Sequence, residues 1–160
     1  MLDDLLLLME GRFNTLGVRV SSDLPPEINV EGFPAELRQV FTNLITNAAE
    51  AAAEGGAVTV RIIPQKAGPD SSGHRQEAGA IVKIIDNGPG ISPNIRDHLF
   101  QPFFTTKGER GTGLGLWVSQ GIIRKHAGTI QLESHTEGPD RGTTASVFLA
   151  SKPVMDLGGN

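Results

Sequence analysis

The sequence predicts an α+β fold, in which a mixed sheet of about five strands is covered on one face by about three helices to form a two-layer sandwich. Segments in which apolar and polar residues alternate come in pairs along the chain, and segments with apolar residues at helical spacing separate these pairs. The 160 residues are enough for one domain with a hydrophobic core, and the chain is short for two domains. We find no internal repeat.

The first third of the chain predicts two helices and an edge strand. Residues 2–13 look helical but carry little to pack by themselves, so they are either the end of a longer helix or an ordinary N-terminal helix. Residues 18–23 alternate like an edge strand. A long helix opens at Pro34, because proline suits a first helical turn, and ends at the glycine pair 55–56. Its apolar face consists of Leu37, Val40, Phe41, Leu44, Ile45, Ala48 and Ala52.

The rest of the chain predicts four strands and one helix. The strands are expected at 58–63, 80–86, 129–134 and 143–150, and the helix at about 114–126. The segment between the first two of these strands is polar and glycine-rich and has no period, which indicates a mobile hairpin loop.

The composition excludes several classes of protein. Without cysteine there is no disulfide framework and no thiolate metal site. The longest apolar run, residues 5–9, is far too short to span a membrane, and acidic residues precede it where a signal peptide would be positive. A net charge of −4 gives no electrostatic footprint for nucleic acid. We therefore expect a cytoplasmic domain without direct membrane contact. The four histidines are scattered without ligand-like spacing, which favours surface or structural roles.

Asn43 and Asn47 share one stripe of the long helix with Glu36 and Glu50, beside its apolar face. Asparagine is a mediocre helix former, so helix propensity does not explain a pair at this spacing. The stripe is either a solvated flank or a row of amide oxygens that face a cleft. In the second case it suits Mg²⁺, which takes oxygen ligands and brings phosphates with it.

The segment DNGPGI, residues 86–91, follows a predicted buried strand. It is either an ordinary turn or a pocket floor, in which Gly88 and Gly90 let a ligand approach the backbone. The Asp86 carboxylate accepts hydrogen bonds only, so its ligand partner would be a donor such as the exocyclic amine of adenine.

The segment GTGLG, residues 111–115, exposes backbone N–H groups where a helix begins. Such groups and the positive end of the helix dipole favour anions, and a triphosphate is one. The alternative is a flexible loop with a glycine-tolerant cap. The pattern of a Walker A loop and the dinucleotide pattern are both absent.

A segment rich in phenylalanine, residues 92–110, lies between these two motifs. It is typical of a lid whose aromatic residues, Phe100, Phe103 and Phe104, anchor its base. Lys107 and Arg110 would then reach phosphates, although Lys107 is equally compatible with a solvated position.

Four motifs in this order resemble the ATP-binding catalytic domain of bacterial two-component sensor histidine kinases, in the GHKL or Bergerat-fold superfamily. They are NLITNAAEA, DNGPGI, FQPFFTTK and GTGLGLWVSQGIIRKHAGTI, and the resemblance covers about residues 33–150. It implies the Bergerat α/β sandwich with a flexible ATP lid. The implied domains are the end of a dimerisation and phosphoacceptor hairpin at 1–13, the catalytic domain at 14–152 and a tail at 153–160.

The resemblance also implies roles for individual residues. Asn47 would ligate Mg²⁺, Asn43 would hold the phosphates, and both would be catalytic, while Asp86 would bond the adenine amino group. The positions implied to bind the nucleotide are Asn43, Asn47, Asp86, Gly88, Gly90, Ile91, Lys107, Gly111, Thr112, Gly113, Leu114, Gly115, Leu116 and Thr143.

Asn43 separates branches of the superfamily. The gyrase, mismatch-repair and heat-shock ATPases and the anti-sigma serine kinases have a glutamate there, and an amide cannot act as a general base. The resemblance therefore implies transfer of the ATP γ-phosphate to a histidine on a dimerisation domain. It also implies a response regulator as a partner of the kinase. The alternatives are an ATPase or serine kinase of the superfamily, or a degenerate module that only binds a partner.

Two departures from the family pattern matter. Glu50 stands where many histidine kinases have a basic residue that contacts phosphate, so that role would move to another residue, for which Lys107 is the candidate. The phosphoacceptor motif, a histidine followed by an acidic residue, matches none of the four histidines.

Overall fold

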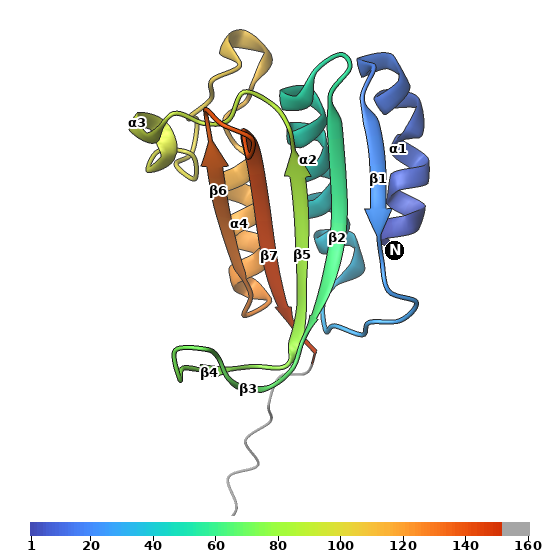
Figure 1. Cartoon of the computed structure of the whole chain (residues 1–160), viewed down its shortest axis with the longest axis vertical. Coiled ribbons are helices and arrows are strands. Elements are labelled where there is room, and N and C mark those ends of the chain that lie inside the picture. Colours follow the sequence, from blue (N-terminus) through green and yellow to red (C-terminus); the bar gives the residue numbers. More distant parts are fainter. Residues whose placement is uncertain (152–160) are drawn as a thin grey trace, which may run out of the picture.

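One layer of the domain is a five-stranded sheet and the other is helical, as seen in the computed structural model, which describes residues 1–151 (Figure 1). The predicted tail at 153–160 lies outside the described residues. The helices are α1 (Leu2–Leu16), α2 (Pro34–Ala52), the one-turn α3 (Pro93–Arg96) and α4 (Gly115–Lys125), with a 3-10 turn, η1 (Gly108–Arg110). The strands are β1 (Arg19–Asp23), β2 (Ala57–Gln65), β3 (Gly68–Pro69), β4 (Arg75–Gln76), β5 (Gly79–Asp86), β6 (Thr129–His135) and β7 (Gly142–Ala150).

The main sheet is mixed and has the order β1-β2-β5-β7-β6. Strand β1 is at one edge and runs parallel to β2, and all other neighbours are antiparallel. The predicted α+β sandwich, its mixed sheet and its edge strand at 18–23 are therefore confirmed. The predicted hairpin loop between β2 and β5 is more ordered than expected, because β3 and β4 pair within it. The short α3 and η1 were not predicted, since four or three residues are too few to show a period.

The helices α1, α2 and α4 lie on the same side of the sheet (Figure 1). Alternate residues of the strands face them, so Val82 and Ile84 of β5 are buried while their neighbours are half-exposed. The predicted apolar stripe of α2 fills the core, in which Val40, Phe41 and Ile45 are almost inaccessible to solvent. None of the helices in residues 1–151 is long and apolar enough to cross a membrane.

Helix α1 packs onto the domain through one face. Its buried residues are Leu2, Leu5, Met9 and Phe13, which recur at helical spacing. Gly17 ends the helix with a φ of +64°, a conformation that glycine adopts without strain. Residues 2–13 thus carry more packing surface than their sequence suggested.

Ends of two helices and two strands meet at one end of the sandwich, the upper end in Figure 1. The carboxyl ends of α2 and β5 lie there with the start of α4, and β7 begins beside the end of β5, where Asp86 pairs with Thr143. The three motifs singled out in the sequence are therefore brought to one end of the fold.

Candidate nucleotide-binding site

The glycine turn after β5 lies against the end of α2. A Cβ atom on Gly88 would meet the backbone carbonyl carbon of Ala51 at 2.8 Å. Ala51 is one helical turn beyond Asn47, and Asn47 is one turn beyond Asn43, so the three residues follow one another along one stripe of α2. The Asp86 turn and the asparagine stripe therefore belong to one site.

Asp86 is a buried carboxylate with few partners. It is 6% exposed, and its Oδ1 accepts a hydrogen bond of 2.8 Å from the backbone N–H of Gly88. Burial raises the pKa of Asp86, while the backbone N–H groups of Gly88 and Thr143 act against the rise. A buried acceptor of this kind suits a ligand that brings a hydrogen-bond donor.

Ser134 is a polar residue of this site that was not predicted. Its Oγ accepts from the backbone N–H of Ile91 at 2.8 Å, donates to the carbonyl of Gly142 at 2.8 Å, and lies 2.9 Å from the Oγ1 of Thr143. Arg96 also donates to the Ser134 carbonyl oxygen. Ser134 thus joins the turn after β5 to β6 and β7. Its signal was available, because it occupies an inward position of β6 where alternation calls for an apolar residue.

Gly90 has a backbone conformation that needs glycine. Its φ is +75°, and a Cβ atom would meet the carbonyl carbon of His135 at 2.7 Å. Both facts make any other residue unfavourable there. A positive φ, which an ordinary turn at residues 86–91 would require of its glycines, is found at Gly90 and not at Gly88. Gly88 is needed for a different reason, namely its close approach to α2.

Asn43 joins α2 to the start of α4. Its Nδ2 donates a 3.0 Å hydrogen bond to the Oγ of Ser119, which is 2% exposed. A Cβ atom on Gly115 would meet the Nδ2 of Asn43 at 2.8 Å and its Cγ at 2.9 Å, with Oδ1 nearer still. The glycine therefore lets the first turn of α4 approach the Asn43 amide.

The segment interpreted from its sequence as a lid closes on itself at its base. The backbone N–H of Phe103 donates to the carbonyl of Gly113 at 2.8 Å, and a Cβ atom on Gly113 would meet the Phe103 Cα at 2.7 Å. The expectation that aromatic side chains anchor this base is wrong for Phe103, whose side chain is 76% exposed. The backbone makes the closure instead, and Phe103 adopts a φ of +68° for it.

The remaining predicted residues follow that closure into α4. Thr112 accepts a long hydrogen bond of 3.4 Å from the backbone N–H of Leu114, and Leu114 caps the helix. Leu116 packs against the hydrophobic core, and its side chain therefore holds α4 in place. A Cβ atom on Gly111 would collide with the side chain of Thr105.

Lys107 and two residues of α2 form a polar cluster. The ammonium of Lys107 donates to the Oδ1 of Asn47 at 2.8 Å and pairs with the Oε2 of Glu50. The other oxygen of Glu50 accepts from Arg12 of α1 at 2.6 Å. Burial raises the pKa of Glu50, but Lys107 and Arg12 together outweigh it and leave the pKa below its usual value. Arg12 was not predicted, because nothing in the sequence connects it with Glu50.

The donor set fits a magnesium ion that arrives with phosphates. Within residues 1–151 no group of three or more histidine, aspartate or glutamate side chains could hold a metal by itself. Asn47 offers an amide oxygen that already accepts from a cation, the Lys107 ammonium. Mg²⁺ keeps several waters and takes few protein ligands when phosphates supply the rest, so one amide oxygen is enough.

The predicted structural role of the histidines holds for His126. Its Nε2 accepts from the backbone N–H of Phe33 at 3.0 Å, and its Nδ1 lies 2.8 Å from the carbonyl of Ile122. These contacts tie the residue before α2 to the end of α4.

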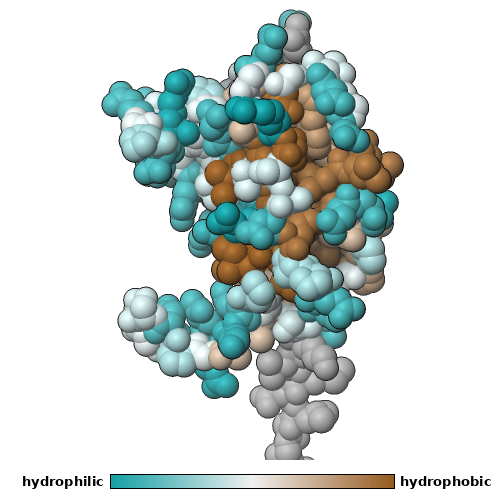
Figure 2. All heavy atoms as spheres, turned by 45° about the vertical axis from the view of Figure 1, so that its right-hand side comes forward, coloured by the Kyte–Doolittle hydropathy of each residue, from teal (hydrophilic) through white to brown (hydrophobic). Residues whose placement is uncertain are grey.

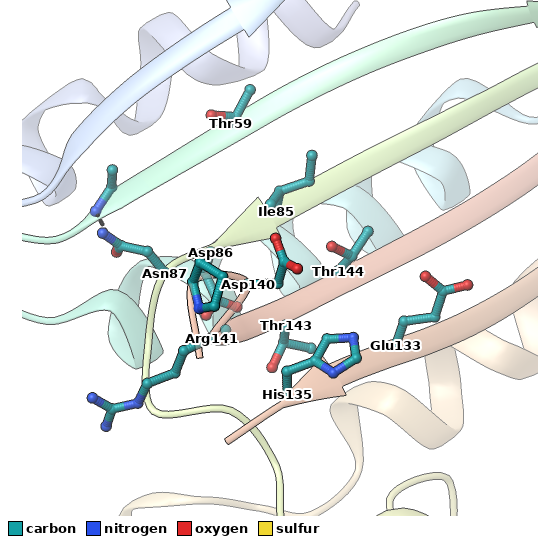
Figure 3. A pocket seen from close by; sticks show the side chains of 13 residues that line it. Thr59, Ile85, Asp86, Asn87, Glu133, His135, Asp140, Arg141, Thr143 and Thr144 are labelled. Atoms are coloured by element: carbon teal, nitrogen blue, oxygen red, sulfur yellow. Dashed lines mark hydrogen bonds between the residues drawn. The ribbon is translucent and has the colours of Figure 1, made fainter. Parts of the chain in front are cut away.

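A hollow of about 380 Å³ lies at the same end of the sheet, and Figure 3 shows its lining. Its walls include Thr59, Ile85, Glu133 and Thr144, which occupy the strand positions that face away from the helices. Asp86, Gly142 and Thr143 contribute to its edge, whereas Asn43, Asn47 and the 111–115 loop do not line it. The hollow is therefore a separate feature from the cluster on the helical side.

Comparison with known proteins matches residues 32–153 to the family described as Histidine kinase-, DNA gyrase B-, and HSP90-like ATPase. The chain belongs to this family. It is 40% identical over 148 residues to the C4-dicarboxylate transport sensor protein DctB of Rhizobium meliloti, which covers 90% of this chain and 21% of that protein. It is 34% identical over 146 residues to sporulation kinase A of Bacillus subtilis, which covers 91% of this chain and 22% of that protein.

The solved catalytic domain of the histidine kinase ThkA superposes with a TM-score of 0.77 and 26% identity, over 94% of this chain and 92% of that domain. The predicted resemblance is therefore confirmed: this is an ATP-binding catalytic domain of the sensor histidine kinase type. It spans about a fifth of the length of the two curated relatives.

Proposed function

We propose that this domain binds Mg-ATP on the helical side of the sheet and passes the γ-phosphate to a histidine on a separate dimerisation domain. The observation that carries the proposal is the amide of Asn43. It sits beside the glycine start of α4, at the position where the hydrolytic branches and the anti-sigma kinases have a glutamate. An amide has no basic atom that could activate water. The incoming imidazole supplies its own nucleophilic nitrogen, so the domain only has to position the nucleotide.

The adenine end of the proposed site is formed by the turn after β5. Asp86 would accept from the exocyclic amine, while Gly88 and Gly90 leave room for the ring. Ile91 lies next to the turn, and its backbone N–H is fixed by Ser134. Thr143 lies across from Asp86 in the sheet and hydrogen-bonds to its carboxylate through the backbone.

The phosphate end is formed by α2 and the start of α4. Asn43 and Asn47 would face the phosphates and the metal, and Lys107 would supply the positive charge that Glu50 cannot. Backbone N–H groups at the start of α4 favour an anion there. The residues whose backbone would line the phosphates there are Gly111, Thr112, Gly113, Leu114, Gly115 and Leu116.

Asn47 would hold the magnesium ion. A magnesium ion held there would supply positive charge to the phosphates during transfer. The residues of this chain contribute the orientation of the nucleotide. Asn47 is placed by α2, and Asn43 by its bond to Ser119.

Residues 1–13 fit the end of a helical dimerisation domain. Leu7 and Leu8 of α1 are 71% and 73% exposed, while the opposite face of the helix is buried against the domain. Figure 2, which brings the α1 side of the molecule forward, shows apolar surface there. A helix with apolar residues on both faces fits between two partners. We therefore propose that the outer face of α1 packs against the rest of the acceptor hairpin. Residues 14–152 would be the catalytic domain, which works in the cytoplasm and serves a response regulator.

The first test is calorimetric titration of the chain with ATP, with and without Mg²⁺. We expect binding that Mg²⁺ tightens and that Asp86→Asn weakens by about tenfold or more. The matched control is Asp140→Asn, since Asp140 lines the hollow on the other face of the sheet. Loss of binding in Asp140→Asn alone would move the nucleotide to that hollow. The absence of binding in the folded wild type would favour a module that only binds a partner.

The second test identifies the acceptor. The chain is mixed with labelled ATP and an acceptor hairpin from a related kinase. Acid-labile label on the hairpin histidine supports the proposal. Acid-stable label on serine would indicate the anti-sigma branch, and steady phosphate release without an acceptor would indicate an ATPase.

A further inference from the structure

The contact between Lys107 and α2 brings the lid to the proposed metal ligand. Lys107 is the residue before η1, and its ammonium lies 2.8 Å from Asn47 Oδ1. The same ammonium pairs with the Oε2 of Glu50, one turn further along α2. One side chain of the lid therefore bridges two residues of α2, and one of them is the residue assigned to the metal.

Glu50 connects this contact with α1. Its two carboxylate oxygens are divided between two cations, Lys107 on one and Arg12 of α1 on the other. The three side chains together carry one excess positive charge next to Asn47. Glu50 thus connects α1 with the lid through a single carboxylate.

We propose that Glu50 is a positioning residue whose carboxylate holds the lid through Lys107 against Asn47, so that Mg-nucleotide must displace this ammonium from the amide oxygen. Arg12 makes the strength of this hold depend on α1. The inference rests on the proposed function in one respect, namely that Asn47 ligates Mg²⁺.

Competition between the two cations has a simple physical basis. An ammonium and a divalent ion that share one amide oxygen would lie only a few ångströms apart, and their repulsion is strong at that separation. The nucleotide relieves the conflict, because its phosphates offer Lys107 new acceptors. Glu50 opposes the exchange, since the ion pair must be broken or stretched when Lys107 moves.

The size of the effect is set by exposure. The side chains of Glu50 and Lys107 are 30% and 41% exposed, so the pair is screened by water. A pair of this kind shifts an equilibrium by about two- to fivefold. This is enough to bias a lid, and it is too little to prevent nucleotide from binding.

The test is amide hydrogen exchange of residues 103–113 in the full chain without added nucleotide. Glu50→Gln is expected to speed exchange of this segment by about two- to fivefold, because Lys107 loses its ion pair. Lys107→Met should speed exchange at least as much, because it also loses the hydrogen bond to Asn47. The double variant should not exceed Lys107→Met, since the pair between Lys107 and Glu50 is already lost there. Arg12→Gln should speed exchange by a smaller factor.

The matched control is Glu36→Gln. Glu36 lies on the same helix, is 32% exposed and pairs with Lys125 at 2.6 Å, but this pair does not touch the lid. Its loss should leave exchange of residues 103–113 unchanged. If residues 103–113 exchange equally fast in Glu50→Gln and in the wild type, Glu50 does not hold the lid. If their exchange is unchanged in Arg12→Gln, the hold does not depend on α1.

Titration with ATP and Mg²⁺ separates this inference from the proposed function. Glu50→Gln should bind Mg-ATP about two- to fivefold more tightly than the wild type. Weaker binding would show that Glu50 prepares Lys107 for phosphate, which overturns the competition. If the wild type binds no nucleotide, the proposed function fails, and the exchange experiment still decides whether Glu50 holds the lid.

Discussion

The approach of α4 to Asn43 can be tested by adding one methyl group. In Gly115→Ala the new Cβ would lie 2.8 Å from the Asn43 Nδ2 and 2.9 Å from its Cγ, closer than real Cβ atoms come to a neighbour. The backbone of Gly115 is helical with no positive φ, so the change adds no backbone strain. The whole cost must come from the side chain of Asn43 or from the position of α4.

The magnitude follows from two contributions. Overpacking in a close contact costs about 1–3 kcal/mol. Moving the Asn43 amide also breaks its 3.0 Å hydrogen bond to the buried Ser119, which contributes about 1 kcal/mol. We therefore expect Gly115→Ala to lower the free energy of unfolding by about 2–4 kcal/mol. Nucleotide binding should weaken as well, because Asn43 leaves its place.

Gly121→Ala is the matched control, because Gly121 lies in the same helix and a Cβ atom added to it would have no neighbour within 4 Å. Alanine there should raise the free energy of unfolding by about 0.5–1 kcal/mol through helix propensity alone. Urea denaturation of both variants and the wild type measures the difference. If Gly115→Ala proves as stable as Gly121→Ala, the start of α4 does not approach Asn43 and our account of this glycine is wrong.

Three further predictions concern Asp86, Ser134 and the metal. Asp86→Asn should weaken ATP binding by about 10- to 150-fold, the equivalent of a hydrogen bond to a charged group of about 1.5–3 kcal/mol, as titration calorimetry can measure. Because the folded-state pKa of Asp86 is raised, the folded protein keeps a proton that the unfolded chain has lost, and stability falls as pH rises from the ordinary aspartate pKa through the raised one. Urea denaturation across that range should show less of this decline in Asp86→Asn. Ser134→Ala should cost about 1–3 kcal/mol in the same assay, since it leaves the Ile91 N–H and the Gly142 carbonyl without their partner. Removal of Mg²⁺ with a chelator should weaken ATP binding in the wild type and have a smaller effect in Asn47→Ala, as calorimetry would show.

The sequence predicted the elements of the fold well where local rules decide. Proline at the start and apolar spacing along one face were enough to place α2, which begins at Pro34 as predicted. It ends at Ala52, three residues before the glycine pair that was predicted to stop it. Alternation placed all five strands of the main sheet, with ends shifted by one or two residues. The parallel pairing of β1 with β2 was not predicted, because it depends on how the chain crosses over between them.

The sequence predicted the motifs of the candidate site but not the residues that hydrogen-bond to them. Asp86 and the glycines stand out locally, since a carboxylate after a buried strand and glycines before a helix are visible in a few residues. Ser134, Ser119 and Arg12 do not stand out in this way. Each becomes meaningful only through a partner that is 43, 76 or 38 residues away in the chain.

The sequence by itself determined where the three long helices and the five strands of the main sheet lie, which face of each is buried, and which family the chain belongs to, because these depend on periodicity and on short motifs. The tertiary structure decided which polar groups meet. It placed Ser119 beside Asn43 and Lys107 beside both Asn47 and Glu50. It closed the base of the segment predicted as a lid through the backbone of Phe103, where aromatic packing was expected. The physical reason is that a hydrogen bond or an ion pair is set by distances of about 3 Å between atoms, and only the packed helices and strands fix such distances.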